Sequence, residues 1–133
     1  MYYITKTFKF EAGHRLMNYS GKCSNLHGHN YEIEVSLGTE DLDDTGFVMD
    51  FADLKKELAP IFEEIDHAMI LCKDDIMLIE MLQYAKQKLY ILDYNPTAEH
   101  IARHLYNILL EQRYPVSLVT VKETPTSVAS YSL

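Results

Sequence analysis

The chain has 133 residues, a length typical of a single domain. Its 20 acidic and 12 basic residues give a formal net charge of -8, which argues against a nucleic-acid-binding surface because such a surface needs a basic patch. No apolar run approaches the roughly 18 residues needed to span a bilayer, and residues 1–6 lack the apolar core of a signal peptide. Two cysteines are too few for a disulfide framework, so we expect a cytoplasmic protein with free thiols.

The first half of the chain predicts two strands separated by a loop. Residues 2–12 alternate loosely and are rich in Tyr, Ile, Thr and Phe, which predicts a strand. Residues 13–26 contain glycine, asparagine and serine and predict a loop. Residues 29–38 alternate strictly between apolar and polar side chains, which predicts an antiparallel strand with one solvated face.

The second half predicts helices and shorter strands. Asp50 is a favourable N-cap for a helix at 51–64, and Pro60 should kink that helix because it removes a backbone donor. Thr97 is a similar cap for a second main helix. The elements after the first helix are a short helix at 74–86, a strand at 89–92, the helix at 98–112 and a strand at 116–123.

This order of elements predicts one α+β domain over residues 1–133, a four-stranded antiparallel sheet with helices on one face. Strands and helices do not alternate regularly, as they would in a doubly wound parallel sheet. A four-stranded sheet by itself has open edges, which proteins usually cover or pair. The pattern therefore favours an oligomer.

The segment Cys23-Ser24-Asn25-Leu26-His27-Gly28-His29 carries the strongest chemical signal. Residues at i and i+2 of a strand point to the same face, so His27 and His29 can hold one metal ion together. His14 ends the preceding alternating run, and an antiparallel strand could bring it alongside. Three histidines leave a fourth zinc position open, the arrangement of a catalytic site, and Cys23 is then a candidate reactive thiol. Ligand type alone leaves copper, nickel and iron open.

Two other interpretations of this segment can be weighed. A structural zinc site could combine Cys23, His27 and His29 with Cys72, but the paired spacings of such sites are absent, and Cys72 fits better as a small buried apolar residue. A cupin motif would also use Glu34, which has the opposite strand parity to His29 and would point away without a bulge.

Three carboxylate segments have both ordinary and functional interpretations. The Asp66-His67 pair is a polar helix end, or a carboxylate that orients an imidazole for proton transfer. Glu123 is a solvated strand residue, or a carboxylate that accepts two parallel N–H bonds from a guanidine-like edge of a heterocycle. Thr97-Ala98-Glu99 is most simply a helix N-cap with an acidic first turn.

Together these residues resemble the 6-pyruvoyl-tetrahydropterin synthase family over nearly the whole chain. The similar segments occur in the family's order: Phe10 to Leu16, Cys23 to Tyr31, Gly46 to Phe51, Ile65 to His67, Asn95 to Glu99, and Lys122 to Thr124. The short C-x3-H-x-H spacing is closer to the bacterial members that form a carboxylated pterin than to the animal pyruvoyl-forming members. His100 departs from the pattern, because the family commonly has Asn there.

The resemblance implies the tunnelling fold (T-fold), in which three subunits close their sheets into a barrel and two trimers often stack into a hexamer. Sites would lie between subunits. The implied cofactor is Zn2+, held by His14, His27 and His29. The implied partners are a small pterin triphosphate and other copies of the chain, with no nucleic acid and no membrane.

The resemblance also implies a lyase that converts 7,8-dihydroneopterin triphosphate to 6-carboxytetrahydropterin, acetaldehyde and triphosphate, on the 7-deazaguanine route to queuosine. Cys23 would be the base, Asp66 and His67 the second acid/base pair, and Glu123 the pterin anchor. Thr97 and Glu99 would assist at the ring edge, and Arg15 and Lys22 are the nearest cations in sequence for the triphosphate. The alternatives are a pyruvoyl-forming synthase, a side-chain aldolase, and a non-catalytic zinc- or pterin-binding oligomer.

Overall fold

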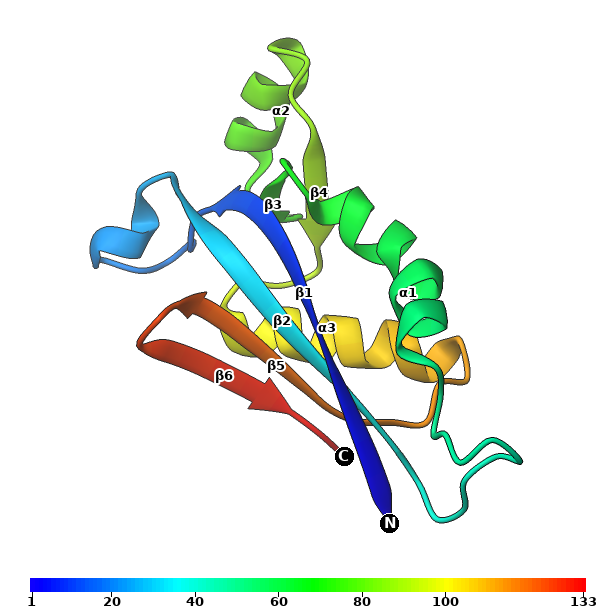
Figure 1. Cartoon of the computed structure of the whole chain (residues 1–133). Helices are drawn as coiled ribbons and strands as arrows, with labels where there is room; N and C mark the ends of the chain where they lie inside the picture. The colour runs from blue at the N-terminus through cyan, green and yellow to red at the C-terminus, as the bar shows by residue number, and fades with distance from the viewer.

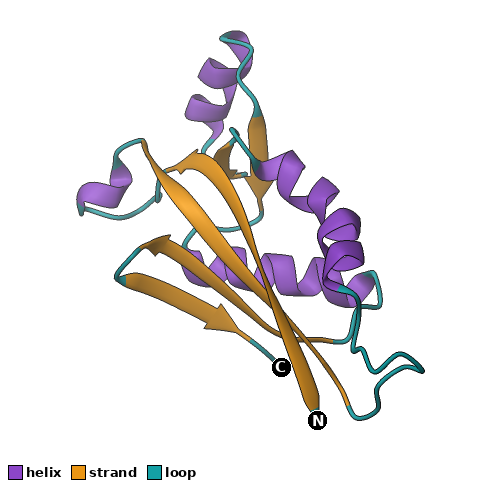
Figure 2. Cartoon of the chain, viewed as in Figure 1, coloured by secondary structure: helices purple, strands orange, loops and turns teal.

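The computed structural model describes all residues from 1 to 133 as one six-stranded sheet with three α-helices (Figures 1 and 2). The strands lie in the order β4-β3-β1-β2-β5-β6. The elements are β1 (Tyr2–His14), a 3-10 turn (Lys22–Ser24), β2 (His27–Thr39), α1 (Phe51–Ile65), β3 (Met69–Cys72), α2 (Ile76–Tyr84), β4 (Leu89–Leu92), α3 (Ala98–Glu111), β5 (Val116–Thr124) and β6 (Ser127–Tyr131).

The long hairpin of β1 and β2 organises the sheet. The two strands pair antiparallel from Tyr2 opposite Thr39 to His14 opposite His27. Apolar and polar side chains alternate along both strands, as the sequence predicted. The apolar ones are buried on one face of the sheet: Phe8, Phe10, Tyr31, Ile33, Val35 and Leu37. The helices α1 and α3 lie on this face, so the apolar side chains of the sheet and helices form one core.

The α+β fold is confirmed, but the sheet has six strands where the sequence predicted four. β3 and β6 were not predicted, and β3 and β4 run parallel to β1. The sequence of β3, Met-Ile-Leu-Cys, is a short apolar run that periodicity cannot assign to strand or helix. Three of the five residues of β6 are serine or alanine, and pairing with β5 rather than intrinsic propensity makes it a strand.

Both predicted helix caps are present. The Asp50 carboxylate accepts hydrogen bonds from the amides of Ala52 and Asp53, and the Thr97 hydroxyl accepts one from the amide of His100. α1 continues through Pro60 to Ile65 and buries Leu54, Leu58, Phe62 and Ile65. Phe51, at the first position of α1, lies outside the core and is 52% exposed.

One edge of β1 is largely open. β3 pairs with it at Gly13 and His14 alone, so residues 2–11 have no partner strand on that side. The solvent face of the sheet is polar and carries ion pairs between Lys9 and Glu32 and between Lys122 and Glu34. The helix α2 projects away from the sheet (Figure 1), and no helix is long and apolar enough to cross a membrane.

Candidate active site

Three histidines meet where β1 ends and β2 begins. His14 and His27 are directly opposed in the hairpin register, and His29 lies two residues further along β2, opposite Ala12. The Nε2 atom of His14 lies 3.0 Å from Nε2 of His27 and 3.1 Å from Nε2 of His29. The three rings therefore direct one nitrogen each to a common point, as predicted.

The hydrogen bonds of the rings determine which nitrogen is free. Nδ1 of His14 donates to the carbonyl of Pro96 at 2.8 Å, and Nδ1 of His27 donates to the carbonyl of Asn25 at 2.7 Å. Each Nδ1 is thereby engaged, which leaves Nε2 of His14 and of His27 directed to the common point. Tetrahedral zinc would space its nitrogens at about 3.3 Å, close to the separations found here. The donor set fits zinc with one position open for another ligand.

Electrostatics keeps these rings available as ligands. Burial is the main cause that lowers the pKa of His14 to about 4, and the neighbouring His27 and His29 lower it further. The bond to Pro96 acts in the opposite direction. Burial, followed by the charge of His27, also lowers the pKa of His29. A ring that stays neutral near pH 7 needs no deprotonation before it binds a metal.

A cavity of about 320 Å3 adjoins His14. Its polar lining includes Cys23, Thr97, Glu99 and Glu123, and its apolar lining comes from Leu16, Tyr19, Ala98, Val128 and Ala129. We call it the Cys23 cavity. Cys23 is a free, half-buried thiol on the 3-10 turn, and the amide of Leu16 donates to its carbonyl at 2.8 Å. Four residues predicted from widely separated motifs therefore share one cavity with a metal-ligand candidate.

Glu123 is suited to bind a hydrogen-bond donor in this cavity. It lies near the end of β5, where the pairing with β6 is irregular between Lys122 and Thr124, and its half-buried side chain lines the Cys23 cavity. Burial raises the pKa of Glu123, the charge of Glu99 raises it further, and His27 partly offsets this. A half-buried carboxylate of this kind is stabilised when a ligand supplies two N–H donors.

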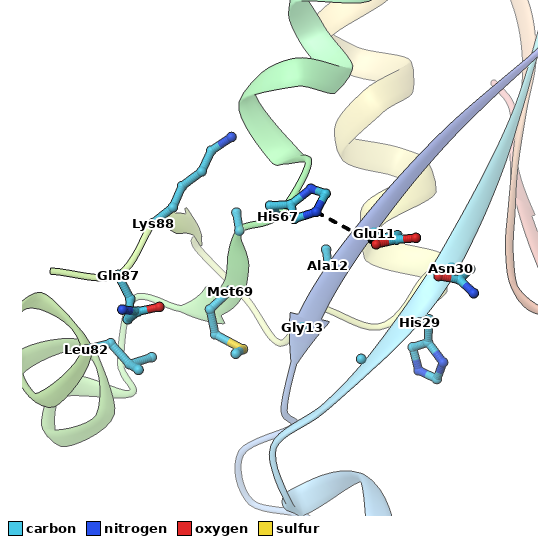
Figure 3. Close-up of a pocket in the computed structure, with 12 residues that line it drawn as sticks. Glu11, Ala12, Gly13, His29, Asn30, His67, Met69, Leu82, Gln87 and Lys88 are labelled. Carbon is cyan, nitrogen blue, oxygen red and sulfur yellow. Dashed lines mark ion pairs between the residues drawn. The ribbon is translucent and has the colours of Figure 1, made fainter. Parts of the chain in front are cut away.

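Asp66 and His67 form the predicted pair but do not line the Cys23 cavity. The Asp66 carboxylate lies 3.0 Å from Nδ1 of His67 and accepts a hydrogen bond from the amide of Glu11. This amide bond is the main cause that lowers the pKa of Asp66, and the bond and charge of His67 add to it. His67 lines a second cavity of about 410 Å3 together with Glu11, His29 and Lys88 (Figure 3). We call it the His67 cavity.

The histidine cluster therefore borders two cavities. His14 lines the Cys23 cavity and His29 lines the His67 cavity. Within one chain the two candidate acid/base groups, Cys23 and His67, open into different spaces.

Two contacts hold the segment that carries Cys23. The carboxamide of Asn95 accepts from the amide of Met17 and donates to its carbonyl, both at 2.8 Å. The guanidinium of Arg15 forms a two-point ion pair with the buried carboxylate of Asp75. Arg15, expected among the triphosphate cations, is therefore already paired. Sequence reasoning missed both contacts, although Asn95 stands in one of the family-like segments.

Two other sequence expectations can be placed. Glu34 pairs with Lys122 on the solvent face and Cys72 is a buried free thiol, and neither belongs to the histidine cluster. His100 donates from Nδ1 to the carbonyl of Asn95 at 2.7 Å and lies against Tyr94, outside the lining of the Cys23 cavity.

Known proteins with similar sequences include two named 6-carboxy-5,6,7,8-tetrahydropterin synthase. The protein from Aquifex aeolicus is 35% identical over an alignment of 155 positions, which covers 96% of each chain. The protein from Rickettsia conorii is 38% identical over 129 residues, which cover 91% of this chain and 93% of the relative.

Solved structures agree in fold. An uncharacterized protein from Wolinella succinogenes matches with a TM-score of 0.82 and 26% identity, covering 98% of this chain and 97% of the other. The 6-pyruvoyl tetrahydropterin synthase of Caenorhabditis elegans matches with a TM-score of 0.71 and 28% identity, covering 99% and 95%. The family model for 6-pyruvoyl tetrahydropterin synthase matches residues 3–133. The chain therefore belongs to the 6-pyruvoyl tetrahydropterin synthase family.

Proposed function

We propose that this protein is an enzyme that converts 7,8-dihydroneopterin triphosphate to 6-carboxy-5,6,7,8-tetrahydropterin, acetaldehyde and triphosphate, in the 7-deazaguanine route to queuosine. The observation that carries the proposal is the Cys23 cavity, which joins a thiol and a half-buried carboxylate to a three-histidine cluster. Relatives at 35% and 38% identity with the carboxy-pterin name support the choice of product.

His14, His27 and His29 would hold the metal, which we propose is zinc. When bound, zinc would supply a Lewis acid that polarises the hydroxyl groups of the pterin side chain and acidifies the protons beside them. The carbonyls of Pro96 and Asn25 fix the tautomers of His14 and His27, so the rings need no rearrangement to serve as ligands.

Cys23 and Glu123 would act directly on the substrate. Glu123 would accept two N–H bonds from the guanidine-like edge of the pterin, and this fixes the ring so that its side chain points along the cavity. Cys23, as thiolate, would remove a proton from the side chain. The hydroxyl oxygen of Thr97 already accepts from the amide of His100 as the helix cap. Its hydroxyl proton would therefore be free to donate to the edge of the pterin ring, beside Glu99.

Asp66 and His67 would form the second acid/base pair, with the carboxylate orienting the imidazole. Their place beside the open edge of β1 supports a site completed between subunits, where the pair of one copy faces the Cys23 cavity of another. Closure of three sheets into a barrel would also pair this open edge. The α2 helix adds exposed apolar surface, with Ile76, Met77 and Met81 each more than 60% exposed. These features support a homo-oligomer, a trimer or hexamer.

The test is to incubate zinc-loaded protein with 7,8-dihydroneopterin triphosphate and to identify the products by mass spectrometry. The proposal predicts a carboxylated tetrahydropterin with acetaldehyde. A pyruvoyl or hydroxymethyl pterin as product would leave the site assignment standing but show that the reaction is a different one. Unchanged substrate, with metal present in the protein, would contradict catalysis and leave a zinc- or pterin-binding oligomer.

A further inference from the structure

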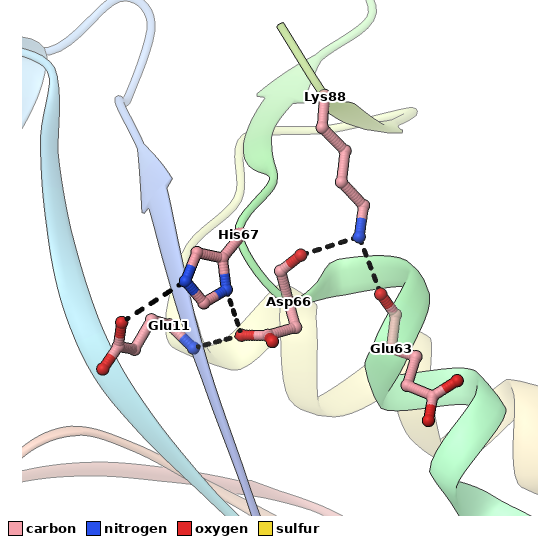
Figure 4. A network of polar contacts seen from close by, with 5 residues as sticks. All are labelled: Glu11, Glu63, Asp66, His67 and Lys88. Atoms are coloured by element: carbon pink, nitrogen blue, oxygen red, sulfur yellow. Dashed lines mark hydrogen bonds and ion pairs between the residues drawn. The ribbon is translucent and has the colours of Figure 1, made fainter.

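The side chain of Lys88 connects the strand β4 to the end of the helix α1. Its ammonium donates to the carbonyl of Glu63 and to the carbonyl of Asp66, both at 2.7 Å (Figure 4). Lys88 directly precedes β4 and also lines the His67 cavity. The helix α1 has no basic residue in its own last turn, so Lys88 supplies the positive charge that a helix C-terminus favours.

The end of α1 explains why a donor is needed there. In a continuing helix, the carbonyl of Glu63 would accept from the amide of His67, four residues later. Here the amide of His67 donates instead to the carbonyl of Glu11 on β1, at 2.6 Å. The carbonyl of Glu63 is left without its helical donor, and Lys88 takes that place.

The same turn sets the direction of the imidazole. His67 has φ of 60°, a left-handed conformation that non-glycine residues seldom adopt, so its surroundings must hold it. The Asp66 carboxylate bonds the amide of Glu11 and lies 3.0 Å from Nδ1 of His67. β1 therefore holds the pair from one side, and Lys88 holds the backbone of the same turn from the other.

We propose that Lys88 is a positioning residue that keeps the Asp66–His67 pair out of the helix and directed into the His67 cavity. The inference rests on the proposed function, in which His67 transfers a proton. Without the ammonium, the free carbonyl of Glu63 competes with Glu11 for the amide of His67. Recapture of that amide extends α1 and withdraws the imidazole from the cavity.

Kinetics of the full-length, zinc-loaded oligomer test this role with three variants. Lys88→Met removes both bonds while retaining the apolar stem, and it should lower kcat about 10- to 100-fold with KM within about twofold of wild type. Lys88→Arg can still donate to both carbonyls and should recover most of the loss. Lys73→Met removes a different lysine, one that directly follows β3 and pairs at the surface with Asp93, and it should behave as wild type.

A second readout does not depend on turnover. Hydrogen exchange of the His67 amide, measured by NMR, should be at least about tenfold faster in Lys88→Met than in wild type or Lys73→Met, because its bond to Glu11 is no longer secured. If Lys88→Met does not fold, Lys88→Gln, which retains one donor, replaces it in both measurements.

The outcomes separate the two proposals. Failure of the wild-type protein to turn over substrate would overturn the proposed function, and amide exchange would then decide the role of Lys88 alone. Wild-type kcat in Lys88→Met, or unchanged protection of the His67 amide, would overturn the inference. A raised KM with kcat intact would likewise contradict the inference, since Lys88 would then act on the substrate directly.

Discussion

Removing the Asn95 side chain should loosen the segment that carries Cys23. In Asn95→Ala the amide and the carbonyl of Met17 both lose their partner. The backbone carbonyls of Asn95 and Pro96, which accept from His100 and His14, remain. The perturbation is therefore confined to the attachment between residues 15–26 and the turn before α3.

The expected cost follows from two hydrogen bonds at a half-buried position. Each contributes about 0.5–1.5 kcal/mol net, so the free energy of unfolding should fall by about 2 kcal/mol. With a urea m-value of about 2 kcal/mol/M for a domain of this size, the unfolding midpoint should fall by about 1 M. Turnover should fall about tenfold through misplacement of Cys23.

Urea unfolding and alkylation by iodoacetamide measure the two effects. Cys23 should react faster in Asn95→Ala, while the buried Cys72 serves as an internal reference. The matched control is Asn107→Ala, an exposed helical asparagine with no side-chain hydrogen bond in the structure. A midpoint within about 0.2 M of that control, with unchanged Cys23 reactivity, would refute the attachment.

Three further changes have defined outcomes. Loss of a residue that only hydrogen-bonds a metal ligand typically weakens metal binding roughly 10- to 100-fold, and His27→Ala should weaken zinc binding by more than that. Unchanged zinc affinity in competition with a chelator would exclude His27 as a ligand. Glu123→Gln should raise KM about 10- to 100-fold with a smaller effect on kcat, through loss of a charge-assisted bond pair; an unchanged KM would remove it from the pterin site. Burial lowers the pKa of His104 below 6.5, so its contribution to stability is complete above about pH 6.5 and is lost as pH falls through the folded-state value. His104→Gln, which can still accept from Tyr90, should flatten the fall of Tm as pH drops below about 6.5, and an equally steep fall would contradict this. The charged groups that face His104, and partly oppose the shift, are Glu111 and Asp93.

The histidine cluster was predictable because strand parity and hairpin register are local properties. Two histidines two residues apart share a face of β2, and the antiparallel return of β1 brings His14 opposite His27. The N-caps Asp50 and Thr97 were predictable for the same reason, since a cap depends on residues within one turn.

The parts that escaped prediction depend on contacts distant in sequence. Asn95 bonds Met17 across 78 residues, and Arg15 pairs with Asp75 across 60. Arg15 looked like a free cation because its partner follows an apolar strand that was itself not predicted. The contact of Lys88 with the end of α1 likewise depends on the position of β4, which the sequence does not reveal. Contacts between residues this far apart leave no periodic signal in the sequence.

Comparison of wild type with Cys23→Ala tests most directly whether the Cys23 cavity is the site of the chemistry. Both proteins are loaded with zinc, their metal content is determined, and turnover of 7,8-dihydroneopterin triphosphate is measured. The account predicts equal zinc content and loss of turnover by a factor of about 100 or more in the variant. Turnover retained within about tenfold at equal zinc content would show that the thiol is not the base.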